Sequence, residues 1–161
     1  MAHNAYMTIT GKTQKLISAK CSTPESLGNR HQTGHTDEIM VLSYHHTMSR
    51  SGNSNHSTHY PLVITKYVDK STPLLAQAFS DNEEVECTIN FYRVASHGGQ
   101  ELHFSAKLTG GVITDLVHGM PDTLLRPDGE FQEHVSISYQ DIRWTHPIAN
   151  SSGYSYWGDK S

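Results

Sequence analysis

The chain contains no run of about 18 apolar residues, the length that a membrane-spanning helix requires, so nothing in it predicts membrane insertion. Its first residues, MAHNAYMTITGK, lack the basic segment and following apolar segment that mark a secretory signal peptide. We therefore expect neither a transmembrane helix nor a signal peptide.

Cysteine and positive charge are also scarce. Cys21 and Cys87 are the two cysteines; they lie far apart and form no CxxC pair. We expect two reduced thiols in a cytoplasmic protein, with one disulfide as the alternative. The 12 lysines and arginines are outnumbered by 16 aspartates and glutamates, a formal net charge of -4. The chain thus lacks the basic face that non-specific nucleic-acid binding needs.

The chain is rich instead in uncharged polar residues. Charged residues make up 17% and hydrophobic residues 35%, so its polarity comes mainly from Ser, Thr, Asn, Gln and His. That mixture favours strands and turns over surface helices. Its 161 residues fit one domain with a buried core, and no linker or repeat divides them.

Alternation of apolar and polar residues predicts most of the structure. In residues 84–91, Val85, Cys87, Ile89 and Phe91 alternate with polar residues, as in a strand with one buried face. A similar run covers 100–109, and the Gly pair at 98–99 fits a hairpin turn between the two. Gly110-Gly111 then predicts a bulge or bend. Further strands are predicted at 5–10, 16–21, 38–48, 61–68 and 135–144.

One segment, DKSTPLLAQAFSDN, predicts a helix over about residues 72–80. Ser71 or Thr72 can cap it and Pro73 suits its first turn. A single helix among many short antiparallel strands predicts a β-barrel or a sandwich. The polar segment SRSGNSNHSTHYP, which begins at residue 49, is too long for a tight hairpin and predicts a functional or mobile loop.

Twelve histidines raise the question of a metal site. His45 and His46 are adjacent, so on a strand they point to opposite faces and cannot share one ion. His31 and His35 lie in a segment unsuited to a helix, and no HExxH, GxSxG or P-loop motif is present. We expect no metal, no cofactor and no catalytic residues; a metal-dependent enzyme remains an alternative without a motif.

Several longer runs are more specific than alternation. The segment VITKYVDKSTPLL (63–75) resembles a signature of the Hcp family (haemolysin-coregulated protein), the tube protein of bacterial type VI secretion systems. The segment HTDEIMVLSYHHTMSRSG (35–52) matches the strand that precedes the family's extended loop. FYR, GGQE, YQDIRWTH and SSGYSYW follow in family order, so the resemblance runs from AYMTITG to the final Trp.

The resemblance implies a mainly β fold: a small β-barrel of two antiparallel sheets, with one flanking helix and an extended loop at about 49–60. It implies one such domain over 1–161, without a C-terminal effector domain. Members form hexameric rings that stack into a tube and carry effector proteins in the lumen. The implied partners are further copies of the chain, secreted effectors, and the tip, spike and sheath proteins of the machine. Such a protein is exported from the bacterial cytoplasm without a signal peptide.

The resemblance also assigns residues to surfaces. Those expected to face the lumen and its effectors are Ser43, His45 and Thr47. Those expected in the ring-stacking loop are Arg50, Asn53, Asn55, His56 and His59. Those expected at the subunit interface are Ile39, Val41 and Tyr44. The signature residues Lys66, Asp69, Lys70, Ser71 and Thr72 are interpreted mainly as the turn and cap that start the helix.

Two further expectations concern the histidines. His31 and His35 should be solvated or at a subunit rim, while His46 should point into the packing, opposite His45. Six copies of His45 around a ring would also repel one another as they charged. The alternative to a ring-forming subunit is a monomeric β-barrel module that binds a sugar or another small ligand.

Overall fold

The computed structural model describes residues 4–53 and 55–157, and it confirms a mainly β fold with one principal helix. In chain order the strands are β1 (Asn4–Gly11), β2 (Lys15–Leu16), β3 (Ile39–His45), β4 (Met48–Ser49), β5 (Thr58–His59), β6 (Leu62–Tyr67), β7 (Val85–Val94), β8 (Gln100–Gly119), β9 (Gln132–Ser138), β10 (Asp141–His146) and β11 (Ser151–Tyr156). The helices are α1 (Pro24–Leu27) and α2 (Ser71–Ser80), with 3-10 turns at Gly28–Arg30 and Thr33–His35. No helix within the described ranges is long and apolar enough to cross a lipid bilayer.

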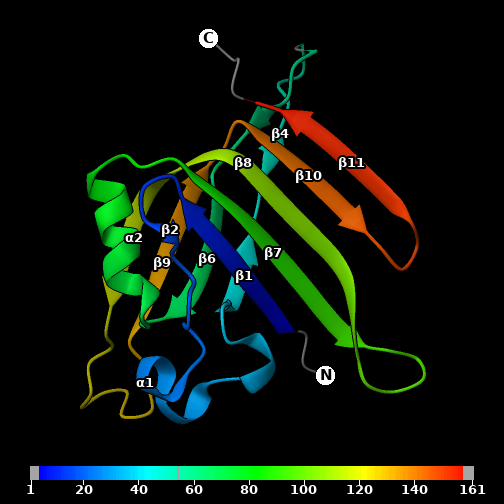
Figure 1. Ribbon diagram of the computed structural model, residues 1–161. Coiled ribbons are helices and arrows are strands. Elements are labelled where there is room, and N and C mark those ends of the chain that lie inside the picture. The colour runs from blue at the N-terminus through cyan, green and yellow to red at the C-terminus, as the bar shows by residue number, and fades with distance from the viewer. Residues whose placement is uncertain (1–3, 54, 158–161) are drawn as a thin grey trace.

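Six antiparallel strands close into a barrel in the order β8-β7-β1-β3-β6-β9, and β9 pairs back onto β8. The first half of β8 pairs with β7 and β10, and its second half pairs with β9. β10 and β11 extend one wall past the closed part, and α2 flanks the barrel (Figure 1). The two expected sheets are therefore two walls of one continuously hydrogen-bonded sheet, because the long β8 belongs to both.

The corner of β8 lies at the predicted glycine pair. Gly110 adopts a positive φ of 63°, a region that disfavours residues with a side chain. A Cβ on Gly111 would lie 3.0 Å from the carbonyl oxygen of Val85 on the neighbouring strand. The register between β7 and β8 also shifts beside Val85. The glycines thus let the strand bend and its neighbour approach closely.

The hydrophobic core fills the barrel. Its fully buried apolar side chains include Met7, Ile9, Ile17, Ile39, Leu62, Ile64, Leu75, Ile89, Leu108, Ile137 and Ile142. Cys21 and Cys87 are buried free thiols in this structure. Burial raises the pKa of each thiol to about 12, so both remain protonated and unreactive at neutral pH.

Helix α2 occupies the predicted range, but its cap differs. The carboxylate of Asp69 accepts hydrogen bonds from the backbone N–H of Ser71 (2.9 Å) and from its hydroxyl (2.6 Å). The side chain that accepts a hydrogen bond from the first amide of the helix is therefore that of Asp69, and not that of Ser71 or Thr72. Leu75 and Ala78 face the core, whereas Phe79 remains 45% exposed.

Three local predictions were wrong or incomplete. The strand expected at 16–21 ends after Leu16, because the chain turns so that the amides of Ile17 and Ser18 both reach the carbonyl of Ile9. The short helix α1 was not predicted, since four residues carry no helical period. Strand β11 was not predicted either, because its Ser- and Gly-rich sequence is almost wholly exposed.

Candidate interaction surfaces

The outer face of β3 presents the residues expected to face the lumen. A register shift between Val41 and Ser43 places the successive side chains of Leu42 and Ser43 both on the outside. Alternation continues from Ser43, so His45 is exposed as well. The hydroxyl of Ser43 donates to that of Thr65 on β6 (2.7 Å), which lies 2.8 Å from Nδ1 of His134 on β9. These three residues are direct cross-strand neighbours. They form a polar ladder across three strands of the wall.

A shallow hollow of about 570 Å³ lies next to this ladder. It runs from His45 and Thr47 across Pro61 and Val63 to Asp115 on β8. The hydroxyl of Thr47 lies 3.0 Å from Nε2 of His45, so the structure brings these two predicted residues together. The wall therefore combines polar groups with apolar area and one carboxylate, a surface suited to loose contact with a protein segment.

The residues expected at the subunit interface lie mostly inside their own chain. Ile39 is fully buried and Val41 is 8% exposed, and both belong to the core. Tyr44 was also expected at the interface, but the same register shift turns it inward, where its ring meets Phe91 edge-on at 4.8 Å. Burial raises the pKa of Tyr44 to about 12. These side chains pack against the core of their own chain, so their contribution to an interface would be to fix the position of β3.

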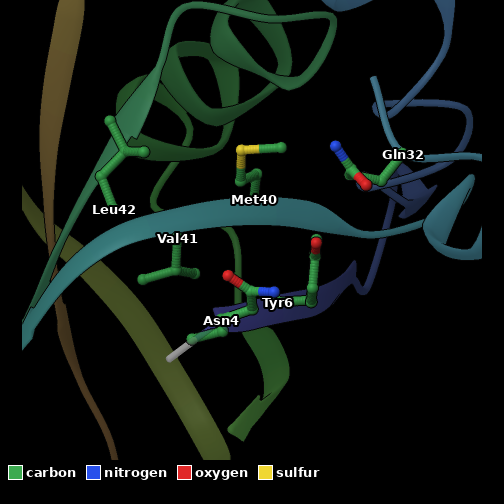
Figure 2. Close-up of a pocket in the computed structure, with 7 residues that line it drawn as sticks. Asn4, Tyr6, Gln32, Met40, Val41 and Leu42 are labelled. Atoms are coloured by element: carbon green, nitrogen blue, oxygen red, sulfur yellow. The ribbon is translucent and has the colours of Figure 1, made fainter. Parts of the chain in front are cut away.

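The apolar area on the outer side of β3 comes from Met40 and Leu42. Figure 2 shows both on one side of the strand and Val41 on the other. With Asn4 and Tyr6 of β1 they line a groove of about 280 Å³, closed at one end by Gln32. Leu42 is 37% exposed. An apolar strip beside a groove is a surface that another protein chain can cover.

The extended loop connects the two strands of a short hairpin. β4 and β5 pair through Met48 with His59 and Ser49 with Thr58, and the amide of Tyr60 donates to the carbonyl of Thr47 (3.0 Å). Four of the loop residues expected to contact another ring are exposed; they are Arg50, Asn53, Asn55 and His56. The loop projects beyond the barrel near β10 and β11 (Figure 1).

His59, also expected in the ring-stacking loop, is 2% exposed. Its Nδ1 lies 2.6 Å from the hydroxyl of Tyr139, its Nε2 lies 3.0 Å from that of Ser155, and its ring stacks on Trp157. His46 points inward, opposite His45 as expected, and its Nε2 lies 2.6 Å from the same Tyr139 hydroxyl. Sequence reasoning did not find this cluster, because no spacing rule connects His59 with residues 80 and 96 positions away.

The signature segment surrounds a buried ion pair. The ammonium of Lys66, which is fully buried, lies 2.5 Å from the carboxylate of Glu133 and 3.0 Å from that of Asp69. Thr72 donates to the same Glu133 oxygen. The signature residues therefore act as a turn, a cap and a charged core contact. Glu133 was missed, although its inward parity with Val135 on β9 could have indicated a buried partner.

The remaining histidines of the described ranges lie apart from one another or pack on their own chain. Within residues 4–53 and 55–157, no three His, Cys, Asp or Glu side chains lie close enough to hold an ion. His31 contacts the carbonyl of Gly28, in keeping with a solvated position. His35, expected to be solvated or at a rim, is packed on its own chain: it stacks on Tyr6 at 3.7 Å and bonds Glu38.

Comparison with known proteins identifies the family. Residues 6–146 match the family described as "Type VI secretion system effector, Hcp". The chain belongs to the Hcp family. It is 36% identical over 166 aligned residues to a "Major exported protein" of Pseudomonas aeruginosa, covering 98% of this chain and 96% of the relative.

Solved Hcp structures share the fold. One is described as the secreted protein Hcp3 of Pseudomonas aeruginosa, with 35% identity, a TM-score of 0.87, and coverage of 97% of this chain and 99% of that one. Another, described as an Hcp protein, gives 34% identity, a TM-score of 0.91, and coverage of 97% and 98%. The Hcp family consists of structural secretion-system proteins rather than enzymes.

Proposed function

We propose that this chain is a subunit of a type VI secretion tube: six copies form a ring, rings stack, and effector proteins travel in the lumen. The observation that carries the proposal is the extent of the similarity, which covers 98% of this chain and 96% of an exported relative. A likeness over the whole barrel argues for the same use of the barrel. The proposal includes export from the bacterial cytoplasm and contacts with tip, spike and sheath proteins.

The polar wall supports the lumen assignment. Ser43, His45 and Thr47 lie outside the barrel and share one face, next to the hollow that reaches Asp115. The hydroxyl and imidazole groups of this wall make replaceable hydrogen bonds, and the shallow hollow beside them adds apolar contact without enclosing a cargo. The wall suits a channel that holds an effector and then releases it.

Ring closure supplies a role for the strip beside the groove. Cyclic symmetry requires two different surfaces of the chain to meet, since each subunit contacts its neighbour head to tail. In this proposal Met40 and Leu42 supply the contact area on one of them. Ile39, Val41 and Tyr44 contribute from beneath, because their packing fixes the position of β3.

Stacking is assigned to the extended loop. Four residues of the segment that joins β4 to β5 are exposed: Arg50, Asn53, Asn55 and His56. Their side chains are polar, so the contact between rings would be a hydrogen-bonded and hydrated one.

Native mass spectrometry of the purified protein, across micromolar concentrations, tests the proposal. The expected result is a species of six times the chain mass, with rings visible by negative-stain microscopy. A protein that stays monomeric throughout would overturn it. That result would favour the module for a sugar or another small ligand, for which the hollow beside His45 would be the first place to seek binding.

A further inference from the structure

Two histidines share one tyrosine hydroxyl at the base of the extended loop. Nε2 of His46, Nδ1 of His59 and the Tyr139 oxygen form two contacts of 2.6 Å each. A third contact, 3.0 Å long, joins Nε2 of His59 to Ser155. His46 follows β3, His59 lies in β5, Tyr139 follows β9 and Ser155 lies in β11. The cluster therefore ties both ends of the loop to two other parts of the barrel.

The two histidines lie at the two ends of the extended loop, so the cluster holds these ends together. The loop leaves the barrel directly after His46 and returns through His59. Contacts at the base include the two β4–β5 pairs, the bond from the amide of Tyr60 to the carbonyl of Thr47, and a bond of 3.3 Å from the hydroxyl of Ser49 to that of Tyr60. So short a hairpin has little stability of its own. Its position on the barrel depends on the contacts at its two ends.

Counting the hydrogens shows how many of the two histidines can be protonated while both hydrogen bonds to Tyr139 remain. A tyrosine hydroxyl has one hydrogen, so it donates to one imidazole and accepts an N–H from the other. This arrangement is complete when both histidines are neutral and stays complete when one is protonated. Two protonated histidines would both direct an N–H at the Tyr139 oxygen. The hydroxyl would then have to turn away, and two cations would face each other across one atom.

The surroundings of His46 also disfavour its charge. The titratable groups that act on it or contact it are His45 from β3, His59 from β5, and Tyr139. Trp144 of β10 covers another side, with the ring centres 6.4 Å apart. Within the described residues, no carboxylate forms an ion pair with His46. A proton on this ring is thus balanced by none of its neighbours.

We propose that His46, Tyr139 and His59 form an acid-sensitive latch that holds the base of the extended loop on the barrel at neutral pH and releases it on acidification. The geometry of the shared hydroxyl carries this inference. Its consequence for ring stacking rests on the proposed function, whereas the latch itself is a property of one chain.

The direction of the pH effect follows from the pKa of His46. Burial, and then His59 and His45, lower this pKa below its ordinary value of 6.5. The closed latch therefore binds its proton more weakly than the open one. Its stability is fully present above pH 6.5 and is lost as the pH falls from there through the lowered pKa. Each unit of lowering changes the opening equilibrium about tenfold.

Hydrogen exchange by mass spectrometry on the intact protein tests the latch. Protection of residues 47–60, corrected for the intrinsic effect of pH, should fall several-fold between about pH 7.5 and about pH 5. Trp144 and Trp157, the two tryptophans of the chain, contact the cluster, so their fluorescence should titrate in step. His46→Gln keeps a group that bonds Tyr139 but cannot be charged, and should abolish the change. His97→Gln, on the exposed β7–β8 turn, is the control and should leave it intact.

Tyr139→Phe provides an independent arm. Removing the shared hydroxyl should open the loop base at neutral pH already and leave no further acid response. Unchanged protection of wild type over this pH range, or an undiminished response in His46→Gln, would overturn the latch. Oligomer mass is recorded on the same samples. A titrating latch in a monomeric protein would overturn the tube proposal alone, and an unresponsive loop in hexamers would overturn the latch alone.

Discussion

At the scale of single residues, the buried Lys66 explains part of why the family signature reads as it does. Taking an ammonium out of water costs several kcal/mol unless it is paired and hydrogen-bonded. Here Glu133, Asp69 and Thr72 supply oxygens around it, and a further bond goes to the carbonyl of Tyr67. The ion pair joins β6, β9 and the start of α2. Its value is in fixing their relative position.

Replacing Lys66 by methionine should therefore cost more than the loss of one contact. Two core carboxylates would lose the ammonium between them, and among the described residues only the imidazole of His118 would remain as a basic group beside Glu133. Breaking a buried pair in this way typically costs about 3–5 kcal/mol. Urea unfolding followed by circular dichroism measures the change. Lys12→Met is the matched control, because Lys12 forms an ion pair with Glu84 at the surface and its side chain is 74% exposed. Similar losses from both substitutions would show that the buried pair has no special role.

His45 tests the proposed lumen wall at the same scale. It is exposed and its one side-chain hydrogen-bond partner among the described residues is Thr47, so His45→Glu should leave folding and ring formation intact. The added negative charge, close to Asp115 across the hollow, should change which effectors co-purify from the native cell. His97→Glu on the β7–β8 turn is the control. A normal hexamer with unchanged cargo recovery would show that His45 does not line the carrier surface.

Alternation along a strand predicts which way a residue points, and not what it meets. It placed His45 and His46 on opposite faces correctly, because adjacent residues on a strand point to opposite sides. Which of the two points outward was predicted from the family resemblance and not from alternation. Alternation could not find the partners of His46, since Tyr139 comes from a strand end more than ninety positions away. Tyr44 was misplaced for a related reason. The irregularity of β3 at Val41–Ser43 leaves no mark in the sequence such as a glycine.

At the scale of elements, the regular strands were predictable and the short or exposed ones were not. The strands β7 and β8, the β7–β8 turn and the bend at Gly110 all followed from alternation and paired glycines. β2 and β11 did not, because β2 consists of two residues and β11 has no buried face that would impose a period. Helix α2 was placed within one residue, while the carboxylate that accepts from its first amide belongs to Asp69, two positions before the first helical residue, Ser71.

The extended loop is the element whose role can be separated from the barrel. Replacing residues 50–57 by Asn-Gly would join β4 to β5 through a two-residue turn that suits a hairpin. The pairs Met48–His59 and Ser49–Thr58 would be retained, so the chain should fold and close into rings. Sedimentation and electron microscopy should then show separate rings where the wild type forms stacks. Restoring eight residues of Gly and Ser separates the effect of length from that of the exposed side chains. Loss of the rings themselves would show that the loop belongs to ring closure.

At the scale of the whole molecule, the barrel is closed except where β10 and β11 extend one wall. Closure removes most strand edges, so in the proposed ring copies of the chain would meet mainly through side chains on the outer faces of the walls. The wall formed by β3, β6 and β9 carries the polar ladder and the hollow. The strip of Met40 and Leu42 lies beside it, over β1 and β3. Neighbouring placement of the two surfaces suits a ring, in which the lumen face of each subunit must continue into that of the next.

Leu42 offers the sharpest test of that arrangement, because the chain contains a second leucine of equal exposure. Leu42 and Leu16 are each 37% exposed, the first beside the groove and the second on β2. A glutamate at position 42 would bury a charge in every interface of the ring. A residue central to an interface typically costs about 2 kcal/mol or more on removal, and closure repeats this cost at each contact. Native mass spectrometry should therefore show monomers for Leu42→Glu and hexamers for Leu16→Glu, with similar melting temperatures for both. Hexamers from both variants would show that Met40 and Leu42 do not lie at the interface. Monomers from both would mean that β2 also lies at the contact.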